Sequence, residues 1–322
     1  MPFLTPSSAV RLRRAAALAV LLASGGALPA AEAVVNAFAG SETLVICRSS
    51  FVPRAGEEVW FRVVRDHRTV AAGTVRAGGD GRIALPVALP GIRPGVALPL
   101  EVTLRAGSEQ GRVLPGGGTL WALAEQPLPP GRNPAAPRAI RLYDPVGRTE
   151  AAFRSISLPF ESVVRLAALA AMTNTTLVVG EDLALESERG LWEALMASVA
   201  QGNRILLLAP ADGVLRPPAD WQLLMAGPAD RLLRAPPRGG AAYKLDLREW
   251  PPAGAVRIRF RLAAIRDQVV FEAGSAAGCE AVRWTDAASG GSFTACGLGI
   301  IASWETAPAA RWLLVELLNE EK

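Results

Sequence analysis

The chain has 322 residues, a formal charge of +4 at pH 7 and a single histidine. Half of its residues are hydrophobic and 20% are charged, which indicates packed cores and excludes a wholly disordered chain. A length of this size suggests about two domains. One imidazole excludes any metal site built from several histidines. The basic residues are nearly all arginine and are spread evenly along the chain, so nucleic-acid binding is not expected.

Residues 1–33 have the three parts of a secretory signal peptide. Three arginines between positions 11 and 14 precede an apolar run over 15–22, and small residues lead to an Ala-Glu-Ala sequence at 31–33. The run is shorter than the about 20 residues that span a membrane, although an uncleaved anchor is the alternative. No transmembrane span is expected in the mature chain. We therefore predict export to the periplasm or the extracellular space.

Residues 34–125 are predicted to form an all-β domain. Short apolar or alternating runs are separated by turn-forming glycines and prolines, which is typical of a small β-sandwich of the immunoglobulin or fibronectin type. Residues 126–138 carry five prolines and predict a stiff linker between two domains. The expected strands cover 43–47, 58–64, 69–75, 83–87, 98–104 and 119–123.

Residues 139–322 are predicted to form an α/β domain. Apolar strands without polar alternation lie at 176–179 and 205–208, and the helix 187–201 between them has Ser187 as its expected N-cap. Gly202 is its expected C-cap. This alternation predicts a mostly parallel sheet. Further strands are expected at 139–143, 160–164, 256–262, 268–272, 282–285, 292–296 and 300–304, helices at 149–156, at 165–172 and from Pro308, and an irregular insertion at 212–250.

Three segments of this domain carry a resemblance to known proteins: the strand and loop Thr175–Asp182, the helix, turn and strand Leu191–Leu208, and the glycine-rich stretch Cys296–Ser303. Together they resemble the class I glutamine-amidotransferase-like superfamily, which implies a flavodoxin-like, three-layer α/β fold. The resemblance is to the degenerate, non-catalytic type of extracytoplasmic bacterial proteins. Active members place a nucleophilic cysteine on a sharp turn after a strand, with a histidine and a glutamate. Here Ala-Pro-Ala-Asp at 209–212 follows the strand and the domain lacks histidine, which excludes amidotransferase chemistry.

Four carboxylates follow predicted strands, namely Asp144, Glu181, Asp182 and Asp212. Ligands of open parallel sheets bind beyond the carboxyl ends of the strands, so these side chains could share a ligand or cation crevice. They could bind a hard cation such as calcium, or act in glycoside hydrolysis, which needs no histidine. The structural alternative is that they cap helices and form turns. No catalytic residue, metal site or cofactor is assigned.

Three cysteines, the histidine and one tryptophan are the other side chains that could carry chemistry. Cys279 and Cys296 flank a predicted hairpin, which would allow a disulfide, although two buried free cysteines would give the same sequence. Cys47 is expected in the core. His67 is expected at a solvated hairpin turn. Trp60 is expected in the core, with stacking on a sugar as the alternative.

The sequence therefore predicts an exported, non-catalytic protein of the bacterial cell envelope. Its β-sandwich and its amidotransferase-like domain would serve as binding or structural modules. The expected partner is another envelope protein or a glycan, and not a nucleic acid. The second hypothesis is a carbohydrate-active accessory protein or glycoside hydrolase that uses the carboxylates after the strands.

Overall fold

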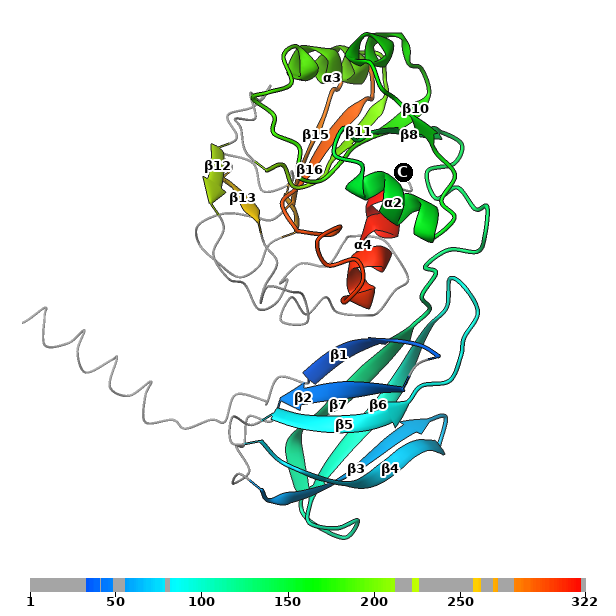
Figure 1. The fold of residues 1–322 in the computed structure, drawn as a ribbon, viewed down its shortest axis with the longest axis vertical. Coiled ribbons are helices and arrows are strands. Elements are labelled where there is room, and N and C mark those ends of the chain that lie inside the picture. The colour runs from blue at the N-terminus through cyan, green and yellow to red at the C-terminus, as the bar shows by residue number, and fades with distance from the viewer. Residues whose placement is uncertain are drawn as a thin grey trace, which may run out of the picture. The chain divides into compact units, whose positions relative to one another are not determined.

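The computed structural model describes residues 33–40, 42–48, 56–78, 82–211, 222–225, 257–261, 269–271 and 281–319. Over these residues the protein is a mixed α/β structure with two main sheets and few helices (Figure 1). None of the helices in these ranges is long and apolar enough to cross a membrane. Residues 1–32, Asp212 and Cys279 lie outside the described residues, so what we expect of them stays a prediction.

The N-terminal half contains a five-stranded sheet with the order β1-β7-β6-β3-β4. β1 and β7 run parallel, and the other neighbours are antiparallel. β2 and β5 form a separate antiparallel pair, and side chains from this pair join those of the sheet in one hydrophobic cluster. All six predicted strands are present, and β1 is an additional one. The bounds are β1 Ala33–Phe38, β2 Glu42–Arg48, β3 Glu58–Arg65, β4 Arg68–Arg76, β5 Arg82–Ala88, β6 Ala97–Ala106 and β7 Val113–Leu123.

The alternating pattern of β3 explains why it is a strand with one buried face. Val59, Phe61 and Val63 are buried, and the residues between them are partly exposed. β3 turns into β4 through Asp66 and His67, whose positive φ angles of 45° and 67° suit a two-residue hairpin turn. His67 is exposed there, which confirms the expected solvated turn. Cys47 is a core residue as predicted, and burial raises the pKa of its thiol to about 12.

The C-terminal half contains a seven-stranded sheet with the order β14-β15-β16-β11-β10-β8-β9. The strands from β16 to β9 are parallel, and β15 and β14 extend the sheet in antiparallel fashion. A mostly parallel sheet is what the strand–helix alternation predicts. A further antiparallel pair joins β12 Gln222–Met225 to β13 Ile258–Arg261. The bounds of the sheet are β8 Ala139–Tyr143, β9 Glu161–Ser162, β10 Thr175–Val179, β11 Arg204–Leu207, β14 Val269–Phe271, β15 Ala281–Thr285 and β16 Ser292–Cys296.

Helices cover both faces of this sheet, which makes three layers (Figure 1). All residues of β10 are buried, because Val178 packs toward one face and Leu177 and Val179 pack toward the other. The Val178 side carries α2 (Arg148–Ser155) and α4 (Pro308–Leu318). The opposite side carries the 3₁₀ helix η1 (Leu166–Ala171) and α3 (Leu191–Ala200).

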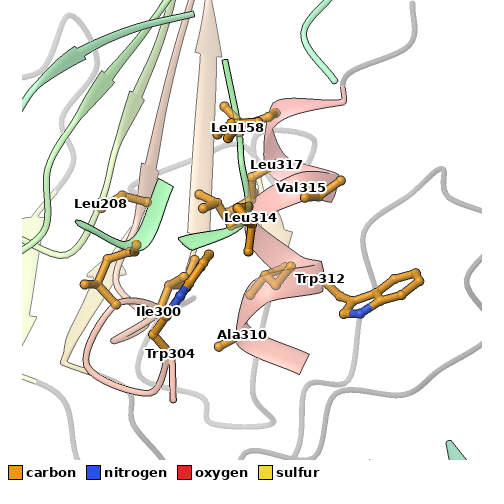
Figure 2. Packing of buried hydrophobic residues seen from close by; sticks show 14 of the residues in the cluster. Leu158, Leu208, Ile300, Trp304, Ala310, Trp312, Leu314, Val315 and Leu317 are labelled. Carbon is orange, nitrogen blue, oxygen red and sulfur yellow. The ribbon is translucent and has the colours of Figure 1, made fainter. Parts of the chain in front are cut away.

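The helix α4 is enclosed by other parts of the chain, and all its residues except Glu316 are buried. Figure 2 shows the ring of Trp312 extending from the side of the helix opposite to Leu314. The indole N–H of Trp312 donates a hydrogen bond to the carbonyl of Ala124 over 3.2 Å. Arg311 donates to the carbonyl of Glu125 over 3.1 Å. α4 therefore contacts the end of the N-terminal half as well as the seven-stranded sheet.

The proline-rich segment 126–138 contains no helix or strand, as expected of a linker. Leu128 and Ala135 nevertheless pack in the same hydrophobic cluster as α4. At these two residues the segment is packed, whereas the sequence predicts a stiff, extended linker that is not a packed element.

Two local predictions are wrong. α3 begins at Leu191 after Gly190, which has a φ of 79°, and Ser187 donates its hydroxyl to the carbonyl of Ala184 instead of capping the helix. Gly202 has a φ of 83° just beyond the helix end, as expected. Residues 300–304 form turns and not the predicted strand, because the amides of Ile301 and Ala302 bind the side chain of Glu181 in the loop after β10.

Candidate functional site

The carboxyl ends of β8 and β10 lie where the connections of the sheet change direction. From β8 the chain passes to β9 on one side, and the next strand, β10, lies on the other side of β8. Such a switch point is where ligands bind in open parallel sheets. Asp144 directly follows β8, and Glu181 and Asp182 follow β10 after a single glycine. Three of the four predicted carboxylates are thus brought together here, and the fourth lies outside the described residues.

Asp144 binds the start of α2 and packs against the loop after β10. Its Oδ2 accepts a hydrogen bond from the amide of Glu150 over 2.8 Å, which satisfies one of the free amides of the first helical turn. The residue at the N-cap position, Gly147, provides no capping side chain. A Cβ atom at Gly180 would lie only 2.8 Å from Cγ of Asp144. A glycine at position 180 therefore allows the two loops to approach closely.

Glu181 is completely buried, with 0% of its surface exposed. Its Oε2 accepts the amide of Ile301 over 2.7 Å and its Oε1 accepts the amide of Ala302 over 2.9 Å. Its own amide donates to Oγ1 of Thr149 over 3.0 Å. Burial raises the pKa of Glu181 above its ordinary value, although the two amides and Arg257 act in the opposite direction. Glu181 thus holds the turn after β16 against the end of β10.

Asp182 is neutralised by two arginines. Arg148 from the first turn of α2 and Arg257, which directly precedes β13, both form ion pairs with its carboxylate. Nη1 of Arg257 also lies 3.4 Å from Oε1 of Glu181. The amide of Asp182 donates to the carbonyl of Ala209 over 2.9 Å. Each of the three carboxylates therefore has at least one partner from the chain itself, whereas Oδ1 of Asp144 is buried without a hydrogen-bond partner among the described residues. These contacts hold the loops around the switch point together.

Two buried apolar residues follow β11. Leu208 and Ala209 are both fully buried, so the turn that would present a nucleophile in the amidotransferase-like pattern contains a buried alanine. Within the described ranges, no group of three or more histidine, cysteine, aspartate or glutamate side chains could hold a metal ion.

A second group of charged side chains surrounds a pocket of about 430 Å³ beside the start of α3. Tyr143, at the end of β8, donates its hydroxyl to Oε2 of Glu188 over 2.6 Å. Burial and the neighbouring Glu188 raise the pKa of Tyr143. Leu207, the last residue of β11, also lines the pocket, which therefore lies at the same carboxyl edge of the sheet as the switch point. The other lining residues are Leu185, Glu186, Arg189, Gly190, Leu191, Trp192, Glu193 and Leu195.

Sequence reasoning missed this pocket although a signal for it was present. The eight residues 186–193 contain four charged side chains and a tryptophan immediately before and within a helix. We interpreted this stretch only as a helix start. The partners of the carboxylates were also missed, because Arg257 lies 75 residues beyond Asp182.

The other side chains that the sequence singled out, Cys296 and Trp60, both lie on strands. Cys296 is buried on β16, where the register places Ala281 directly opposite, and its pairing with Cys279 stays a prediction because Cys279 lies outside the described residues. Trp60 is half-buried on β3.

Comparison of the chain with protein-family models and with curated proteins finds no match. The resemblance of the α/β half to the amidotransferase-like superfamily therefore stays a proposal.

Proposed function

We propose that this chain is an exported, non-catalytic binding or structural protein of the bacterial cell envelope. The observation that supports its non-catalytic part is that Glu181 and Asp182 at the switch point are bound by the chain itself. A general acid or base must come within hydrogen-bond reach of the proton that it transfers. Glu181 is fully enclosed and Asp182 is paired with two arginines, which supports a structural role for both.

The topology supports the fold that belongs to this proposal. The strands β9, β8, β10, β11 and β16 lie side by side in this order in the sheet. When these five strands are numbered by their position along the chain, the order is 2-1-3-4-5, which is the order of flavodoxin-like sheets. A flavodoxin-like domain of the degenerate amidotransferase-like type over 139–322 fits this order and the buried Ala209 after β11. A β-sandwich over 34–125 fits the five-stranded sheet and the β2–β5 pair that share one core. Export is supported by the three-part pattern of residues 1–33.

The absence of catalysis is tested by incubating the purified protein with peptidoglycan, chitin and xylan and measuring newly formed reducing ends. We expect no release above the blank, either for the native chain or for Asp182→Asn. Hydrolysis by the native chain that Asp182→Asn abolishes would contradict the proposal and favour a glycoside hydrolase.

Export is tested separately. The full chain with a C-terminal tag is expressed in a Gram-negative host, and the fractions are analysed by mass spectrometry. We expect the protein in the periplasm or the medium, without residues 1–33. Retention of the intact chain in the cytoplasm would contradict export.

A further inference from the structure

The pocket beside α3 differs from the switch point because most of its charged side chains are not bound by any residue that the structure describes. Glu186, Arg189 and Glu193 form no ion pair or side-chain hydrogen bond within the part of the chain that the structure describes. Only Glu188 is held, by the hydroxyl of Tyr143. The pocket therefore presents hydrogen-bond acceptors and one guanidinium group to a ligand.

An aromatic ring is fixed beside these charges. Trp192 lines the pocket and is half-buried. Its ring packs edge-to-face on Phe293 of β16, with 5.3 Å between the centroids and 73° between the planes. This contact orients the indole before any ligand arrives, which lowers the cost of ordering it on binding. A preformed concave site that combines an aromatic ring with a few polar groups is typical of small-ligand recognition.

The side chains that line the pocket indicate which class of ligand it could bind. Carboxylates accept hydrogen bonds from hydroxyl groups, the guanidinium of Arg189 donates to ring and glycosidic oxygens, and the apolar face of a pyranose packs against a tryptophan ring. Three carboxylates face one guanidinium, so the pocket is acidic. An acidic pocket repels sugars with carboxylate groups and attracts sugars with a protonated amine.

We infer that this pocket binds a carbohydrate and prefers a sugar unit with a free amino group. This inference rests on the proposed function, because it names a glycan as the partner of the binding protein. In the bound state the sugar ring lies against Trp192, and the amine lies near Glu186 and Glu193. Glu188 is positioned by Tyr143 to accept a hydroxyl group.

The test is isothermal titration of the native chain with three soluble probes: glucosamine oligomers, N-acetylglucosamine oligomers and galacturonic acid oligomers. The glucosamine oligomers are expected to bind tightest, the N-acetylated ones more weakly and the acidic ones not at all. The double variant Glu186→Gln/Glu193→Gln keeps the shape of the pocket and removes two charges. It is expected to weaken the binding of glucosamine oligomers about fivefold, in line with the strength of exposed charge pairs, and to leave the N-acetylated probe unchanged.

Trp192→Phe keeps an aromatic ring against Phe293 but shortens the stacking surface, and it is expected to weaken both probes about tenfold. The matched control is Glu109→Gln, an exposed carboxylate of the N-terminal half, which leaves binding unchanged. The double glutamine variant changes only exposed side chains that have no partner among the described residues, so it remains informative if Trp192→Phe fails to fold.

Two outcomes would overturn the inference: no binding of any probe, or binding that neither pocket variant alters. In both cases the proposed function still stands, because it is tested by the absence of hydrolysis. Release of reducing ends from a bound probe would instead overturn the non-catalytic proposal and leave the pocket assignment in place.

Discussion

Two groups of carboxylates lie at the same edge of the seven-stranded sheet, and the protein uses them differently. At the switch point, Glu181 is fully buried and accepts two backbone amides, and Asp182 is paired with two arginines. Around the pocket, Glu186 and Glu193 are exposed and unbound within the described residues. The residue type and the position at the edge are the same. What separates a carboxylate that supports the fold from one that is available to a ligand is whether the chain itself supplies its partners.

The largest expected effect on the free energy of unfolding comes from removing the buried carboxylate of Glu181. Glu181→Ala leaves the amides of Ile301 and Ala302 without acceptors and Arg257 with one fewer carboxylate. We expect the free energy of unfolding in urea to fall by about 3 kcal/mol. Glu186→Ala, in the pocket, should change it by no more than about 0.5 kcal/mol. Equal losses for the two variants would remove the distinction between the two groups.

The close approach of the two loops at the switch point gives the next largest effect. In Gly180→Ala the added methyl group meets Asp144, which cannot move away without losing its bond to the amide of Glu150. A loss of about 1–3 kcal/mol in unfolding free energy is expected from this overpacking. Gly91→Ala is the matched control, since its Cβ would meet nothing within 4 Å and its φ is not positive. A Gly180→Ala variant as stable as the control would contradict the close packing of Gly180 against Asp144.

The stability contributed by Glu181 is expected to depend on pH. Burial raises the pKa of Glu181 in the folded state above its ordinary value of 4.5. The protonated side chain is therefore favoured by folding, and the stability from this shift is present below pH 4.5 and is lost as the pH rises through the folded pKa. Thermal unfolding across this range should show the native chain losing stability, relative to Glu181→Gln, as the pH increases. A constant difference between the two proteins at every pH would show that the pKa of Glu181 is not shifted.

The smallest effect is expected in the pocket. Glu188→Gln removes the charge beside Tyr143, whose pKa is raised by burial and then by its hydrogen bond and charge interaction with Glu188. Tyrosinate absorbance should show one of the two tyrosines titrating at a lower pH in this variant. Stability at neutral pH should change by less than about 1 kcal/mol. An unchanged titration curve would mean that Glu188 does not contact Tyr143 in solution.

Local patterns of apolar and polar residues predicted most of the helices and strands, because such patterns indicate which faces of a segment are buried. The alternation of β3 and the continuous apolar run of β10 are examples, as is the helix that begins at Pro308. The turn at 300–304 could not be predicted in this way. Its residues are as apolar as a strand, and the carboxylate that binds its amides lies 120 residues away from Ile301.

In the candidate site, too, the positions of the residues could be predicted from local sequence, whereas their distant partners could not. The rule for parallel sheets was enough to bring Asp144, Glu181 and Asp182 to one edge. Whether these side chains are free or bound depends on Arg148 and Arg257, which reach the site from other elements. No spacing in the sequence marks those two arginines among the many others.

The enclosed position of α4 has a consequence for the order of folding. Trp312 binds a carbonyl 188 residues earlier in the chain, and contacts across such a separation form slowly because the intervening loop must close first. The strands of the N-terminal half need no contact with α4 to pair with one another. Leu123 and Leu128 share a hydrophobic cluster with α4, so this cluster stays incomplete until the helix has docked, and incompletely covered apolar surface favours aggregation. Docking of α4 is therefore expected to be a late step of folding that completes this shared cluster.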